Sequence, residues 1–319
     1  MLDAGLGQAD TLLLTTAAPL EQPVTHVQFA HGGTSLYAAL GPTPPGVLLR
    51  VRRIDGTVLE QAVFPTSIVT ALALSPDARS LVAAVVGDQG TTQRTGALYF
   101  ISSDGFRQEA HVAVCHGPVR GLSGFFAREK LYVACEDDTV AEVDAKLRLL
   151  VRAAALAPEP TAPASDPCLP SDIALSRNGT IVFVLCGASG RILYVDRVVL
   201  QPFDSVDVGA GASQLALSPN GRWAVVTHTG RDEVLVVDLR RRLVTAQVPT
   251  PGRPYAVAVG SDGRWAYVAA EGADSEPGVL LQIDLQGRRS TAQIAMPYRV
   301  TGVSVWPGSK SPVMRWSTR

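Results

Sequence analysis

A turn flanked by two short apolar strands recurs seven times along this sequence. The copies begin, in order, at Thr25, Thr70, Arg120, Ser171, Ser213, Tyr255 and Thr301. Successive copies start 45, 50, 51, 42, 42 and 46 residues apart. A period of this length is typical of folds in which each copy forms one small sheet and packs against its neighbours. The chain is therefore expected to form one array rather than separate domains.

Each copy predicts four β-strands. Turn sequences such as Ser-Pro-Asn-Gly at 218–221 favour a hairpin between the first two strands, because Asn and Gly tolerate the backbone angles of tight turns. A third apolar run, such as 234–239, contains a recurring aspartate near its end, and a fourth strand leads to the next copy. These aspartates are Asp144, Asp196, Asp238 and Asp284. We predict an all-β, seven-bladed β-propeller of four-stranded antiparallel blades, forming a single domain over residues 1–319.

The predicted ring needs one more strand to close. The last copy reaches Arg319 after only two strands, while residues 9–16, ADTLLLTT, look like a strand placed before the first copy. An open ring would expose unpaired strand edges, which invite aggregation. We therefore predict that the N-terminal strand pairs into the seventh blade.

The segments GRWAYVAAEG, from Gly263, and NGRWAVVTHTGRDEVLVVDL, from Asn220, resemble the YVTN-type β-propeller repeat. The resemblance covers nearly the whole chain and is strongest over 171–296. Similar repeats occur in surface-layer proteins, in the heavy subunit of amine dehydrogenases and in lactonase-like propellers, so the resemblance implies a fold and no single activity. The asparagine of the motif is replaced in successive copies by Cys135, Cys186, His228 and Ala270.

Composition and charge exclude several classes of protein. The 28 basic and 29 acidic side chains are dispersed along the chain, so no nucleic-acid partner is expected. No stretch approaches the roughly 18 apolar residues of a membrane span. Asp3 and Asp10 stand where a secretion signal would carry positive charge, so the sequence as written predicts a cytoplasmic protein, or a periplasmic or secreted one if a signal peptide has been removed. No cofactor motif appears, and no cofactor is expected.

Residues at the start of each innermost strand should gather at one mouth of the central channel. The predicted ligand-binding residues there are Arg120, Arg253, Arg299, Tyr255, His26, Asp172 and Gln214. Arg253 and Arg299 are equivalent in neighbouring copies and could hold a carboxylate or phosphate, or could instead close structural salt bridges. We therefore expect a scaffold that binds a small anionic molecule or a protein partner at this mouth.

An enzymatic alternative uses the same region. A lactonase-like hydrolase or lyase without a cofactor could use His228 as general base, Glu271 and Asp137 as acidic groups, and Arg253 to stabilise negative charge. The competing interpretation is that these are solvated loop charges. No Gly-x-Ser-x-Gly nucleophile motif is present.

The four cysteines fall on one sector of the predicted ring. Cys135 and Cys186 share the repeat position of His228, and His116 lies in a nearby loop, so these four residues are candidate metal ligands. A disulfide such as Cys115 to Cys168 is a second alternative. The interpretation that we favour is buried free thiols, because Cys135 and Cys186 end apolar runs.

Overall fold

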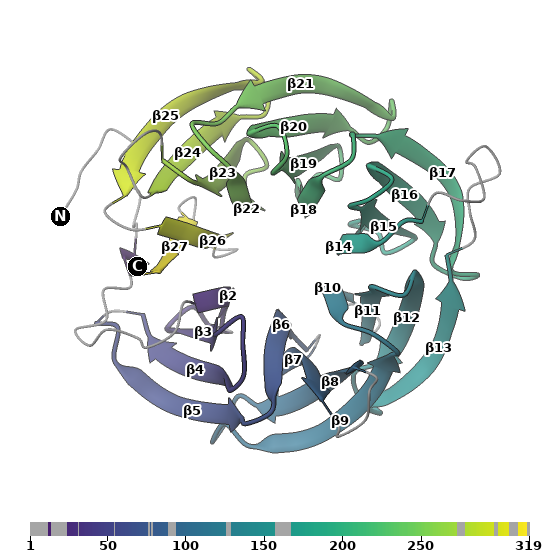
Figure 1. The fold of residues 1–319 in the computed structure, drawn as a ribbon, viewed down its shortest axis with the longest axis vertical. Helices are drawn as coiled ribbons and strands as arrows, with labels where there is room; N and C mark the ends of the chain where they lie inside the picture. The colour runs from purple at the N-terminus through teal and green to yellow at the C-terminus, as the bar shows by residue number, and fades with distance from the viewer. Residues whose placement is uncertain are drawn as a thin grey trace.

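The structure is a computed structural model that describes residues 12–13, 24–30, 32–53, 55–75, 77, 79–88, 94–125, 129–156, 167–272, 278–296, 299–305 and 312–317. Every regular element in these ranges is a β-strand, and the strands form sheets arranged in a ring (Figure 1). No helix in the described ranges is long and apolar enough to cross a membrane. The all-β propeller predicted from the repeat is confirmed.

Six sheets have four antiparallel strands each, in sequence order from the centre outward. Blade 1 contains β2 (Val24–Phe29), β3 (Ser35–Leu40), β4 (Gly46–Arg52) and β5 (Val58–Phe64). Blade 2 contains β6 (Ser67–Leu74), β7 (Ser80–Asp88), β8 (Arg94–Ser102) and β9 (Gln108–Cys115). Blade 3 contains β10 (Val119–Phe125), β11 (Lys130–Cys135), β12 (Thr139–Asp144) and β13 (Leu149–Ala155).

The other three complete blades repeat the same order. Blade 4 contains β14 (Pro170–Leu175), β15 (Ile181–Cys186), β16 (Arg191–Asp196) and β17 (Gln201–Asp207). Blade 5 contains β18 (Ala212–Leu217), β19 (Trp223–His228), β20 (Glu233–Asp238) and β21 (Leu243–Pro249). Blade 6 contains β22 (Pro254–Val259), β23 (Trp265–Ala270), β24 (Gly278–Asp284) and β25 (Arg289–Met296).

The prediction of seven four-stranded blades is wrong, because the structure has six. The remaining sheet has three strands, β26 (Arg299–Val305), β27 (Pro312–Ser317) and β1 (Leu12–Leu13), and we call it the closing sheet. It lies between blades 6 and 1 (Figure 1). The N-terminal strand joins this sheet as predicted, but it runs parallel to β27 over only two residue pairs. Within the described residues this sheet has the strand order β1-β27-β26.

Burial explains the hydrophobic pattern of the strands. Second strands such as β19 are buried along their whole length because neighbouring blades cover both of their faces, and they are therefore continuous apolar runs. Fourth strands such as β13 alternate between exposed and half-buried residues because they lie on the outside of the ring. The core lies between blades: Leu98 and Phe100 of blade 2 pack with Leu131 of blade 3. Burying such a side chain stabilises the fold by about 1.5–3 kcal/mol.

The recurring aspartates cap the turns between third and fourth strands. Asp238 Oδ1 accepts hydrogen bonds from the backbone N–H groups of Arg240 (3.1 Å) and Arg241 (3.0 Å). Burial opposes the ionisation of Asp238, but these two N–H groups and nearby arginines hold its pKa below its ordinary value. The next residue, Arg242, has a positive φ of 57°, and its guanidinium pairs with Asp204 of blade 4. The aspartates are thus structural groups that fix the turn.

Candidate functional site

The start of every inner strand lies beside the end of the second strand of the same sheet. Ala212 pairs with His228 in blade 5, and Val119 pairs with Cys135 in blade 3. We call this end of the ring the mouth, and the end where the inner strands finish the far end. The residues that the repeat places at the start of the inner strands therefore do lie at one common end.

A β-bulge interrupts the inner strand of each complete blade near the mouth, after the first residue pair in five blades and after the third pair in blade 2. The bulged residues are Thr25, Thr70, Arg120, Ser171, Ser213 and Tyr255. The two threonines and two serines of this set each donate a hydrogen bond of 3.3–3.5 Å to the carbonyl oxygen of the residue fourteen positions later, on the second strand. A β-bulge changes the direction in which a side chain points. In these four blades the bulged side chain bonds to the neighbouring strand, which stabilises the sheet.

Blades 3 and 6 carry larger polar side chains at the bulge. Arg120 pairs with Glu136 at 2.7 Å, and the Tyr255 hydroxyl donates a short hydrogen bond to a carboxylate oxygen of Glu271. Each carboxylate lies sixteen residues after its partner, so the two pairs occupy matching places. The mouth therefore holds two carboxylates that already have donors.

Arg253 lies in front of β22 with its side chain exposed. Its carbonyl oxygen accepts a 2.9 Å hydrogen bond from the backbone N–H of Glu271, and a Cβ on the preceding Gly252 would come within 2.9 Å of the Glu271 Cβ. The backbone of Arg253 is thus fixed. Among the described residues, its guanidinium has no hydrogen-bond or ion-pair partner. Arg299, its equivalent, begins β26 and pairs with Ser317, and its side chain lies outside the described part of the structure.

Asp172 and Gln214 connect neighbouring blades instead of facing a ligand. Asp172 Oδ2 accepts a 2.8 Å hydrogen bond from the backbone N–H of Leu215, and Gln214 Oε1 accepts one of 3.3 Å from Val257. Desolvation raises the pKa of Asp172 to about 7, although the N–H groups of Leu215 and Ile173 act in the opposite direction. His26, at the matching place in blade 1, is half-buried. A structural role accounts for the Asp172 and Gln214 side chains.

The three predicted catalytic residues are held in separate environments. His228 is 1% exposed, and within the described part of the chain neither of its ring nitrogens has a hydrogen-bond partner, so its imidazole is not paired with Glu271 or Asp137. Glu271 accepts the Tyr255 hydroxyl. Asp137 is exposed and accepts a 3.2 Å hydrogen bond from the backbone N–H of His116. The structure therefore does not bring His228, Glu271 and Asp137 together in one hydrogen-bonded group.

The cysteines form two disulfides, Cys115–Cys135 and Cys168–Cys186. The favoured interpretation of free thiols is therefore wrong. The alternative of a disulfide is confirmed, but the example given for it, Cys115 to Cys168, has the wrong partners. Each disulfide joins a segment in front of an inner strand to the end of a second strand. In blade 4 the pairing of Pro170 with Cys186 brings Cys168 close, with 4.5 Å between the Cα atoms of the two cysteines. Cys115 ends β9 of blade 2 and meets Cys135 where blades 2 and 3 pack, with 5.7 Å between the Cα atoms. In this oxidised form Cys135 and Cys186 offer no thiolate to a metal. No group of three potential metal ligands occurs among the described residues.

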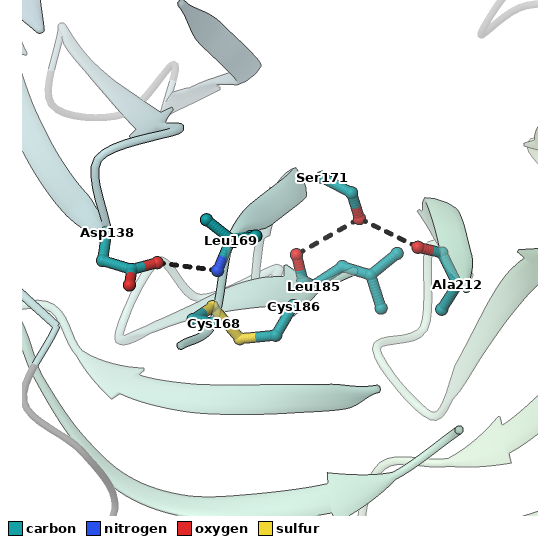
Figure 2. Close-up of a disulfide and its surroundings, with 7 residues drawn as sticks. All are labelled: Asp138, Cys168, Leu169, Ser171, Leu185, Cys186 and Ala212. Carbon is teal, nitrogen blue, oxygen red and sulfur yellow. Dashed lines mark hydrogen bonds between the residues drawn. A yellow bond between two sulfur atoms is a disulfide. The ribbon is translucent and has the colours of Figure 1, made fainter. Parts of the chain in front are cut away.

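The Cys168–Cys186 disulfide is part of a junction between three blades (Figure 2). Asp138 of blade 3 accepts a 2.7 Å hydrogen bond from the backbone N–H of Leu169. The Ser171 hydroxyl lies within hydrogen-bond distance of the carbonyl oxygens of Leu185 (3.3 Å) and Ala212 (3.2 Å), the latter in blade 5. The disulfide therefore fixes the segment in front of β14 where blades 3, 4 and 5 meet.

A cavity of about 660 Å³ lies between blades 4 and 5, at the far end. We call it the interblade cavity. Its walls include three arginines and three aromatic side chains, namely Arg177, Arg240, Arg242, Phe183, Tyr194 and Phe203. None of these residues was predicted to bind a ligand, because every predicted binding residue lies near the start of an inner strand, at the mouth. One feature of the sequence could have indicated this site: Arg177 stands at a repeat position where other copies have Pro76, Pro219 or Ser261.

Comparison with known proteins adds no family to these observations. No protein-family model matches the sequence, and no curated protein matches it. A function is therefore inferred from the residues of this chain.

Proposed function

We propose that this chain is a non-catalytic binding propeller of the YVTN type, in which the closing sheet counts as an incomplete seventh blade, and that its mouth binds a carboxylate-bearing ligand. The observation that supports this best is the guanidinium of Arg253, which is exposed on a fixed backbone and has no partner among the described residues. An arginine in this state presents a planar fork of donors that matches a carboxylate.

The two paired carboxylates of the mouth, Glu271 in the same blade as Arg253 and Glu136 in blade 3, leave Arg253 available. Glu271 accepts the hydroxyl of Tyr255, and Glu136 is paired with Arg120. Because both carboxylates have donors of their own, an incoming carboxylate would compete with solvent for Arg253. The Glu271 carboxylate, in the same blade, would repel a ligand of high negative charge, which favours a ligand with an isolated carboxylate.

Two sources could supply that carboxylate: a free small carboxylate, or an acidic side chain on a partner protein. The recognition chemistry is the same in both, and a ring mouth of mixed charge is compatible with each. An experiment with one probe of each kind separates them.

The hydrolase or lyase alternative has less support. It needs His228 to act on a substrate, and the imidazole is buried without a carboxylate to orient it. The metal alternative needs the thiolates of Cys135 and Cys186, which the oxidised form does not provide.

The two disulfides also favour an oxidising compartment. Cytosolic thiols are usually kept reduced, whereas disulfides persist in the periplasm and outside the cell. We therefore favour the periplasmic or secreted alternative over the cytoplasmic one.

The test uses fluorescence anisotropy with a fluorescein-labelled Gly-Glu-Gly peptide and calorimetry with acetate and succinate. We expect at least one of these probes to bind the wild-type protein and Arg253→Glu to weaken that binding by tenfold or more, since a hydrogen bond to a charged group contributes about 1.5–3 kcal/mol. Arg289→Glu is the matched control, because Arg289 is an exposed arginine of the same blade at the far end. Absence of binding by every probe, or equal losses in both variants, would contradict the proposal.

A further inference from the structure

Blades 4 and 5 line the interblade cavity with different kinds of residues. Blade 4 supplies the turn after β14 and aromatic side chains from β15, β16 and β17. Blade 5 supplies the turn after β18 and the turn between β20 and β21. Its volume of about 660 Å³ is in the range of small-molecule sites, roughly 300–1,000 Å³.

The aromatic part of the cavity is rigid. Tyr194 packs edge-to-face against Phe183, with ring centroids 4.9 Å apart, and against Phe203 at 6.3 Å. The Tyr194 hydroxyl donates a 2.9 Å hydrogen bond to the Leu239 carbonyl oxygen, which ties the aromatic surface to blade 5. Phe203 is nevertheless 52% exposed on an outer strand. An exposed aromatic ring beside a cavity offers a surface for a planar apolar group.

Positive charge at the cavity is only partly neutralised. Arg242 pairs with Asp204 at 2.6 Å. The exposed guanidinium groups of Arg177 and Arg240 have no ion-pair or hydrogen-bond partner within the described ranges. No carboxylate is among the residues that line the cavity. An anion entering it would therefore meet two arginines whose charge is not locally compensated.

The turns beside the cavity have lost the negative charge that other blades carry. Asp77 and Asp262 occupy this turn position in blades 2 and 6, and each accepts a backbone N–H bond within the turn. Asn178 and Asn220 do so in blades 4 and 5 with their Oδ1 atoms. The turn function is thus kept while two charges are absent, and each Asn adds an amide donor. In blade 4 the uncharged Asn178 directly follows Arg177, so this turn has gained a positive charge and has no negative one.

From this geometry we infer that the interblade cavity binds a small planar aromatic anion, with the ring against the exposed Phe203 and the anionic group between Arg177 and Arg240. This site is at the opposite end of the ring from the mouth and does not depend on the function proposed for it. The occupant needs both features, because the cavity combines an aromatic surface with uncompensated arginines.

The probes are 2-naphthoate, uncharged 2-naphthamide and inorganic phosphate, titrated by calorimetry into the full chain. We expect naphthoate to bind, and naphthamide and phosphate to bind at least tenfold more weakly. The Asn178→Asp/Asn220→Asp double variant should weaken naphthoate binding by tenfold or more. It should still fold, because Asp fulfils the same turn role in blades 2 and 6. Arg177→Ala/Arg240→Ala should have the same effect on binding.

Two controls separate this site from the mouth. Arg289→Ala removes an exposed arginine of the far end outside the cavity, and Arg253→Glu changes the mouth. Arg289→Ala should leave naphthoate affinity unchanged. Naphthoate should still bind in the Arg253→Glu background, where the mouth no longer offers its arginine to the naphthoate carboxylate, so the binding that remains reports on the interblade cavity. Thermal melting confirms that every variant is folded. The inference is overturned if naphthoate does not bind, if naphthamide binds equally well, if the two double variants bind like wild type, or if Arg253→Glu abolishes naphthoate binding.

Discussion

The carboxylate of Asp172 accepts a hydrogen bond from the backbone N–H of Leu215 across 2.8 Å, which joins the inner strand of blade 4 to that of blade 5. Gln214 makes the equivalent contact with Val257 of blade 6. Both side chains were expected to face a ligand. Their contacts show that polar residues near the mouth also hold neighbouring blades together.

Removing the Asp172 carboxylate should destabilise the ring. Asp172→Ala leaves the Leu215 N–H without its acceptor, and such a group costs about 1–3 kcal/mol of unfolding free energy. Urea unfolding measures this loss. Asp172→Asn keeps an acceptor oxygen and should lose less at pH 5. Equal stability of Asp172→Ala and wild type would show that the contact contributes nothing.

The same carboxyl predicts a pH dependence. Desolvation raises the pKa of Asp172 from 3.8 to about 7, so the folded state binds this proton more tightly than the unfolded chain. The resulting stabilisation is complete below the ordinary pKa and is lost as the pH rises from about 4 through about 7. Wild type should therefore lose stability relative to Asp172→Asn between pH 5 and pH 8. A difference that does not change with pH would contradict this expectation.

The disulfides should contribute measurably to stability. They close segments of 20 and 18 residues, and bridges over loops of this size typically stabilise by about 2–4 kcal/mol each. Cys168→Ser/Cys186→Ser should lower the melting temperature, and addition of a reductant should lower that of the wild type. Thiol titration of unreduced, denatured protein should detect no free thiol, whereas four would refute both bridges.

The burial of His228 predicts that its imidazole contributes little to stability. Its ring nitrogens are buried without hydrogen-bond partners, so His228→Leu should keep the unfolding free energy or raise it by up to about 2 kcal/mol. His116→Leu changes an exposed side chain and should stay within about 0.5 kcal/mol of wild type. A large loss of stability in His228→Leu would mean that the imidazole has an essential interaction.

The repeat alone predicted the four-stranded unit and the common end where Ser213, His228 and Tyr255 lie. It could do so because strand pairing within a blade is local, and the alternation of apolar residues specifies its register. The sequence did not predict the number of complete blades, since that depends on how many strands the two chain ends supply to one sheet. It also did not pair the cysteines, because Cys115 meets Cys135 only once blades 2 and 3 pack.

The interblade cavity was decided by tertiary structure. Arg177 and Arg240 belong to different copies and to different turns within them, so no local pattern relates the two. They line one cavity because neighbouring sheets pack face to face, which brings the first turn of blade 4 beside the last turn of blade 5. Hydrophobic periodicity specifies which face of a strand is buried, but the polar residues that meet between two blades are determined by the packing of the blades against each other.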